Sequence, residues 1–220
     1  MLVFGESGTP VILFPTSEGR YYEAKDMGII KVVSDLLDSG KIKIYCPDSY
    51  NYQSWLNESI SPEDRIKNHV MYEDLILKDV IDYAIHETGF NKVVIAGFEM
   101  GGYNSINLTF KHPDKIDYLI AISSIINIKY FLGNYYDDNV YFNNPIDYLS
   151  NLKDLWYLER IRKIKIVLGI GESDIRLKEN KEISEILNKK ETLHLLDIRR
   201  KMNSKWDLWK QMFTDYLSAI

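Results

Sequence analysis

The feature that most constrains the fold is the stretch of residues 93–102, an apolar run that enters a glycine-bracketed turn and continues as a helical pattern. Gly97 and Gly101 stand two residues before and two residues after Glu99. In the strand-turn-helix motif G-x-S-x-G, small residues at these two places make a strained turn sterically possible, and its central residue is a nucleophile. The sequence therefore predicts the frame of such a turn, with an acid at its centre in place of serine.

Composition bounds the class of protein. The 220 residues are 45% hydrophobic and 27% charged, which is typical of one globular domain. The net charge of -5 and the scattered lysines and arginines argue against nucleic-acid binding. The single cysteine, Cys46, ends an apolar run, so we expect a buried thiol and no internal disulfide. With no signal-like start and no apolar run of ~18 residues, we expect a cytoplasmic protein without a membrane span.

Apolar runs of strand length alternate with amphipathic segments of helix length, which predicts βαβ units, a mostly parallel sheet and helices on both faces. The predicted strands cover residues 2–4, 11–14, 41–46, 93–97, 116–123, 164–170 and 192–198. The predicted helices cover about residues 25–37, 62–87, 100–111, 175–189 and 206–220. We interpret residues 1–220 as one domain. Its tyrosine- and asparagine-rich excursion at about 127–162 is predicted to form a cap or rim.

In open α/β sheets, sites gather at the carboxyl ends of the strands. Three such ends carry chemistry here: the turn at Glu99, Asp174 just past its strand, and the loop at 199–205. Their order along the chain is the order nucleophile, acid, histidine of a hydrolase triad. We expect the backbone N–H groups of an oxyanion hole at Met100 and in the loop around Ser17.

Several segments resemble pieces of one known family. They are residues 14–17, 45–49, 97–101, 131–136, 143–145 and 171–174. As a set they resemble the small esterases of the α/β-hydrolase fold, the relatives of S-formylglutathione hydrolases and mycolyltransferases. The likeness covers nearly the whole chain, and it implies an α/β-hydrolase fold.

The resemblance also implies a loop of the type Gly-x-x-His-Asp-Trp after the last strand, followed by a second tryptophan. Laid on that pattern, Trp206 and Trp209 match the tryptophans, and the histidine place falls on Ser204. The nucleophile place falls on Glu99, and only Asp174 matches the family. The resemblance therefore implies a degenerate catalytic triad. We expect the two tryptophans to pack in the core rather than to stack on a ligand.

The chain has 4 histidines, and each has an ordinary structural explanation. His69 and His86 lie within the long predicted helix, His112 ends the helix after the turn, and His194 lies in a predicted strand. Of these, His194 comes nearest to a candidate base. Because no histidine or cysteine cluster is present, we expect no metal site and no cofactor.

Two hypotheses account for Glu99. Its carboxylate could accept hydrogen bonds from the Met100 N–H and the Ser17 region and so fill the oxyanion hole. Alternatively, Glu99 is itself the nucleophile, as an acid is in dehalogenases and epoxide hydrolases of this fold. The second hypothesis needs a base, and the hydroxyl of Ser204 is a poor one. Asp174 is either a surface carboxylate or a partner of Ser204 or Lys205, and we expect a salt link to Lys205.

The sequence thus favours an esterase-like homologue without serine esterase activity, a pseudoenzyme that binds a small ligand or a protein partner. The alternative is a working hydrolase, either a carboxylic ester hydrolase or an enzyme that uses Glu99 as nucleophile. The assembly state stays open.

Overall fold

The computed structural model describes residues 1–200 and 202–220, and it is built on a seven-stranded sheet in the order β1-β3-β2-β4-β5-β6-β7. The strand β1 runs antiparallel to β3, and the other neighbouring strands pair in parallel. The bounds are β1 Leu2–Phe4, β2 Thr9–Phe14, β3 Ile42–Cys46, β4 Val93–Phe98, β5 Ile116–Ile122, β6 Lys165–Gly171 and β7 Leu195–Arg199. The predicted fold class, a mostly parallel sheet with helices on both faces, is confirmed.

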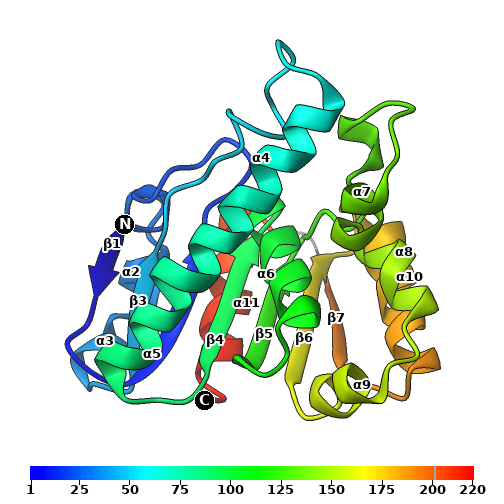
Figure 1. Cartoon of the computed structure of the whole chain (residues 1–220). Coiled ribbons are helices and arrows are strands. Elements are labelled where there is room, and N and C mark those ends of the chain that lie inside the picture. Colours follow the sequence, from blue (N-terminus) through cyan, green and yellow to red (C-terminus); the bar gives the residue numbers. More distant parts are fainter. Residues whose placement is uncertain (201) are drawn as a thin grey trace.

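Helices cover both faces of the sheet because strand side chains alternate between two cores. In β2, Ile12 and Phe14 belong to one core, and Val11 and Leu13 belong to the other. Figure 1 shows α4, α6 and α10 on one face and α11 on the opposite face. The helices of the first face are α4 Pro62–Leu75, α5 Asp82–Thr88, α6 Met100–Lys111, α7 Asp138–Asn143, α8 Pro145–Asn151, α9 Leu155–Ile161 and α10 Leu177–Lys189.

The second face carries α11 (Lys205–Leu217) and three short helices where one helix was predicted for residues 25–37. These are α1 (Glu23–Asp26), α2 (Ile29–Val32) and α3 (Ser34–Asp38). Gly28 has a φ of 78°, a left-handed conformation that interrupts the helical path. The prediction of a single helix was therefore wrong, because the apolar stripe did not reveal this break.

The long predicted helix over residues 62–87 is continuous from α4 to α5 through a π-helix at Ile76–Ile81. The Ser61 hydroxyl accepts the Asp64 N–H at 3.0 Å, and Gly89, with a φ of 73°, ends the helix. Within the described part of the chain, no helix is long and apolar enough to cross a membrane.

The excursion over residues 127–162 folds as a 3-10 turn (Lys129–Phe131) followed by α7, α8 and α9. Ile128, Leu132 and Val140 from this segment are buried in one cluster with Met100 and Tyr103 of α6. Trp55, Ile66 and Ile125 complete that cluster. The start of α6 is thus covered by chain from two distant segments.

Candidate functional site

Glu99 lies between β4 and α6 in the strained turn that the sequence predicted. Its φ of 52° and ψ of -112° are unfavourable for a residue with a side chain, by about 1–3 kcal/mol. Surrounding backbone holds the conformation, because the Glu99 C=O accepts the N–H groups of Tyr103 and Ile125, each at 3.1 Å. The Glu99 N–H donates to the Ile122 C=O at 3.1 Å. The turn is therefore fixed by α6 and by the end of β5 together.

The two bracketing glycines are required by close packing. A Cβ added to Gly97 would lie 2.2 Å from the Gly101 carbonyl carbon, and one added to Gly101 would lie 2.5 Å from the Pro15 carbonyl oxygen. No side chain fits at either place. The contact between Gly101 and Pro15 brings the loop after β2, which contains Ser17, against the first turn of α6.

The Glu99 carboxylate faces two cations. Its Oε1 lies 3.0 Å from Lys205 Nζ and 3.9 Å from Arg176 Nη1, and its side chain is 13% exposed. The helix α6 begins without a side-chain cap. The prediction that this carboxylate accepts the Met100 N–H is therefore wrong, because the ammonium and guanidinium groups draw it away. An oxyanion hole at Ser17 and Met100 stays a prediction. The Ser17 C=O accepts the Asn51 amide at 2.9 Å, and Met100 is buried.

Asp174 follows β6 and pairs with Arg176. Its Oδ1 accepts the Arg176 N–H at 2.9 Å and lies 3.8 Å from Arg176 Nη1. The expected salt link from Asp174 to Lys205 is wrong, since Lys205 pairs with Glu99 instead. The result is a line of alternating charges, Asp174, Arg176, Glu99 and Lys205, which we call the charge row.

Ser204 caps the last helix. Its hydroxyl accepts the Asp207 N–H at 3.1 Å and donates to Asp207 Oδ2 at 2.8 Å. The hydroxyl thus caps the first turn through the Asp207 N–H, and the Asp207 carboxylate accepts its proton. The helix therefore begins at Lys205, whose ammonium reaches Glu99 and also lies 5.0 Å from the ring centre of Trp209. Lys201, in the same predicted loop, lies outside the described residues.

A cavity of about 250 Å³ adjoins the charge row. Asp174, Ser204 and Lys205 line it, so the structure brings these predicted residues together. Ser123, which sequence reasoning missed, also lines it, has a φ of 50° and accepts the Trp209 indole N–H at 2.9 Å. Arg176 was missed too. Ser123 follows β5 and Arg176 follows β6 at the same edge of the sheet. Their position after a strand end is the feature of the sequence that could have identified them as site residues.

The tryptophans pack as predicted. Trp209 is 2% exposed, and its ring stacks on Phe98 with the ring centres 5.2 Å apart. Trp206 contacts the same two rings at 5.9 Å and 4.9 Å. The end of β4 is thus anchored to α11 on the face opposite α6.

Other groups hold three of the histidines. Burial lowers the pKa of His69 to about 4, and its Nε2 lies 3.1 Å from the Tyr103 hydroxyl. His112 Nε2 lies 3.9 Å from the Glu73 carboxylate. His194 Nε2 lies 2.6 Å from the Ser184 hydroxyl, and its Nδ1 lies 2.9 Å from the Thr192 C=O.

His86 is exposed on α5. Across the residues that the structure describes, no histidine hydrogen-bonds to Glu99 or Asp174. The two carboxylates of the charge row therefore have cations, and not imidazoles, as neighbours.

Comparison with known proteins gives a consistent picture. A family model described as "Putative esterase" matches residues 7–215. Among solved structures, a ferulic acid esterase is similar, with a TM-score of 0.72 and 17% identity over 96% of this chain and 84% of that one. An S-formylglutathione hydrolase from Agrobacterium tumefaciens has a TM-score of 0.73 and 13% identity, over 97% of this chain and 83% of that one.

The S-formylglutathione hydrolase of Staphylococcus aureus has a TM-score of 0.66 and 16% identity, over 97% of this chain and 84% of that chain. No curated protein matches the sequence. The structural likenesses establish the fold, and the family model establishes membership. The predicted resemblance is confirmed: this chain belongs to the "Putative esterase" family of α/β hydrolases.

Proposed function

We propose that this chain is a ligand-binding member of its family that does not hydrolyse esters through a serine nucleophile. One observation carries the proposal: the group 3.0 Å from the residue at the centre of the turn is the Lys205 ammonium. An ammonium group only donates hydrogen bonds and cannot take a proton from a nucleophile. In place of a nucleophile paired with a base, the turn holds a carboxylate paired with an ammonium group.

The charge row supports a polar ligand. Its four groups alternate in sign, and the side chains of Arg176 and Lys205 are 23% and 57% exposed. A small molecule that carries both an anionic and a cationic group would complement this pattern, with the adjoining cavity of about 250 Å³ taking its remaining atoms. The proposed ligand is therefore a small zwitterion.

Two measurements test the proposal. With a fluorophosphonate probe and a panel of short-chain aryl esters, we expect no labelling by intact-mass analysis and no turnover above background. With a panel of free amino acids, we expect one or more to raise the Tm, and the shift to shrink in Glu99→Gln. The matched control is Glu191→Gln, a change at an exposed glutamate that pairs with Arg162 at 3.0 Å. Labelling or ester turnover that disappears in Glu99→Gln would overturn the proposal.

The assignment of Glu99 and Ser204 to the nucleophile and histidine places is tested by putting serine and histidine there. Glu99→Ser combined with Ser204→His should create esterase activity, while Glu99→Ser alone should not. Thermal unfolding of both variants serves as the folding control. Activity in the single variant would mean that another base serves the turn.

A hydrolase with Glu99 as nucleophile is the second candidate, favoured by the retained backbone of the turn, with its φ of 52° and ψ of -112°. With an epoxide, a carboxylate oxygen attacks a ring carbon, the ring C–O bond breaks, and the freed oxygen takes a proton from water and stays on the product. A second water then attacks the carboxyl carbon of the enzyme ester and releases the diol. Single turnover of an epoxide in ¹⁸O-labelled water would place the label in Glu99. We expect no label, and its appearance would establish this second candidate.

A further inference from the structure

A second cavity, of about 440 Å³, lies at the end of α6 remote from Glu99, and this is the size of small-molecule sites. It lies between α6 and the helices α7, α8 and α9, which stand beside one another in Figure 1. We call it the aromatic cleft, because its lining includes the side chains of Phe110, Tyr141, Phe142, Tyr148 and Tyr157. Aromatic walls favour a ligand with a flat ring.

Basic side chains outnumber acidic ones around the cleft. Lys111, His112 and Lys153 line it, against the single carboxylate of Asp154. That carboxylate already caps α9, because its Oδ1 accepts the Trp156 N–H at 2.8 Å. Lys111 is already paired with the Glu73 carboxylate, so the charge that favours an anionic ligand comes chiefly from Lys153.

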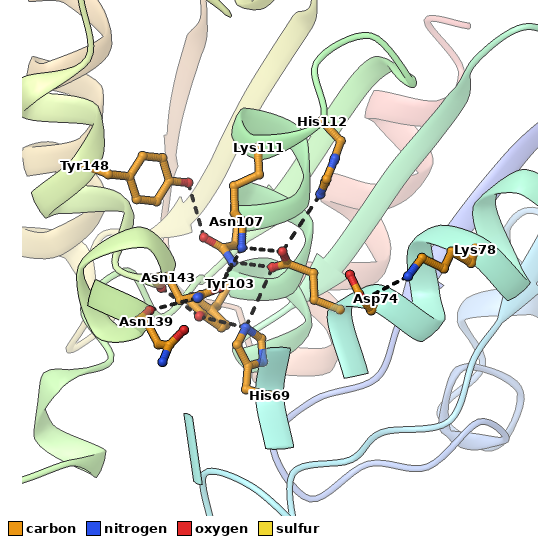
Figure 2. A network of polar contacts seen from close by, with 11 residues as sticks. His69, Asp74, Lys78, Tyr103, Asn107, Lys111, His112, Asn139, Asn143 and Tyr148 are labelled. Atoms are coloured by element: carbon orange, nitrogen blue, oxygen red, sulfur yellow. Dashed lines mark hydrogen bonds and ion pairs between the residues drawn. The ribbon is translucent and has the colours of Figure 1, made fainter. Parts of the chain in front are cut away.

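Lys111 is held in place by the network in Figure 2. Its ammonium contacts the buried carboxylate of Glu73 and donates to Asn143 Oδ1 at 2.9 Å. His112 points toward the same carboxylate from the neighbouring position, at 3.9 Å. An ammonium group has three N–H donors, so one donor of Lys111 is left for a ligand. The two basic groups are thus fixed before any ligand arrives, which lowers the entropic cost of binding.

One stripe of α6 supports this arrangement. Tyr103, Asn107 and Lys111 are four residues apart and therefore share one face of the helix. Tyr103 donates to the Asn143 C=O at 2.7 Å, and Asn107 donates to Glu73 Oε2 at 2.5 Å. Of this stripe only Lys111 lines the cleft, and the hydrogen bonds of Tyr103 and Asn107 support it from the interior.

We propose that the aromatic cleft is a second ligand site and binds a small planar aromatic carboxylate. The ring packs against the aromatic side chains, and the carboxylate lies near Lys111, His112 and Lys153. This site is separate from the charge row and does not depend on the function proposed above.

Binding is tested with 2-naphthoate and with 2-naphthylmethylamine, which has the same ring system and the opposite charge. By calorimetry on the whole protein, we expect 2-naphthoate to bind at least about tenfold more tightly, a difference of about 1.4 kcal/mol. Equal Kd values for the two probes would overturn the proposal, as would no detectable binding of 2-naphthoate.

Two variants place the site, and both change exposed residues outside the buried network. Phe142, 56% exposed, is changed to alanine, and Lys153 is changed to glutamate. We expect each to raise the Kd for 2-naphthoate about fivefold or more, and Lys153→Glu to leave the amine unaffected or bound more tightly.

The control is Tyr52→Ala, which removes an equally exposed ring, 53% accessible, from a different cavity. It should leave the Kd unchanged, and so should Glu99→Gln, which separates this site from the charge row. If Tyr52→Ala weakened binding as much as Phe142→Ala, the cleft would not be the site.

Discussion

Two glutamate–lysine pairs in this molecule differ in ways that separate support of the fold from availability for function. Glu73 pairs with Lys111 in the interior, where the side chains are 7% and 24% exposed. Glu99 pairs with Lys205 at the sheet edge, where the side chains are 13% and 57% exposed. The first pair joins two packed helices, whereas the second joins a strained turn to the start of α11.

Burial and the number of donors account for the difference. Desolvation alone would raise the pKa of Glu73, yet the His112 imidazole 3.9 Å away and the charges of Lys111 and His69 lower it to about 2. The Glu99 carboxylate has one close partner, Lys205, which is mostly in solvent. A ligand can displace that partner at little cost, whereas nothing can displace Lys111 without leaving a buried charge.

The largest expected effect comes from Glu73→Gln. It leaves Lys111 without its buried counter-charge, so we expect the free energy of unfolding to fall by about 3–5 kcal/mol. Urea denaturation measures this, with Glu99→Gln as the matched control at about 1 kcal/mol or less. Equal losses in the two variants would remove the distinction between the pairs.

The second-largest effect should come from acid, which destabilises the fold through the buried groups Glu73 and His69. The pKa of Glu73 falls from an ordinary 4.5 to about 2, and that of His69 from 6.5 to about 4. Both values are lower in the folded state, so the unfolded chain takes up protons first and stability is lost as the pH falls. We expect a loss of about 3 kcal/mol between pH 7 and pH 4. Urea denaturation at a series of pH values checks this, and Glu73→Gln should flatten only the part of the curve below about pH 5.

Relief of strain at the turn should have a smaller effect of opposite sign. Glu99→Gly removes the side chain that the φ of 52° disfavours, so we expect the free energy of unfolding to rise by about 1 kcal/mol. Glu99→Ala also loses the ion pair but keeps a Cβ, and it should show no such gain. A glycine variant no more stable than the alanine variant would mean that the turn stores no strain.

The cap at α11 should give the smallest effect. Ser204→Ala removes a hydrogen bond to the Asp207 N–H and should cost about 1 kcal/mol by thermal unfolding. Ser61→Ala is the matched control, because Ser61 caps α4 through the same contact with Asp64. A much larger loss for Ser204→Ala would indicate that its hydroxyl also holds the charge row together.

The sequence was sufficient to predict the turn at Glu99 and the helix after it, and insufficient to predict which residues contact Glu99. The helix after the turn was predicted at residues 100–111 and is found there, because apolar periodicity and the bracketing glycines are local signals. The partner of Glu99 depends on where α11 begins and on how the loop after β6 turns. Those are tertiary properties, so Lys205 was assigned to Asp174 and Arg176 was overlooked.

The interior network was missed for a related reason. Asn107 and Lys111 are four residues apart, as are His69 and Glu73, and this spacing puts each pair on one helix face. Such spacing does not tell a solvated polar face from a buried one. Glu73 becomes an interior charge only because α4 packs against α7 and because Glu73 contacts Asn107 and Lys111 of α6.

The contact between Gly97 and Gly101 has a consequence for how related chains are detected. Steric exclusion acts on Gly97 and Gly101, and the backbone hydrogen bonds at Glu99 involve none of its side-chain atoms. These contacts therefore hold the turn whichever side chain stands at its centre. A pattern keyed to the flanks, with any residue allowed between them, would gather chains of this kind that a serine-based pattern passes over.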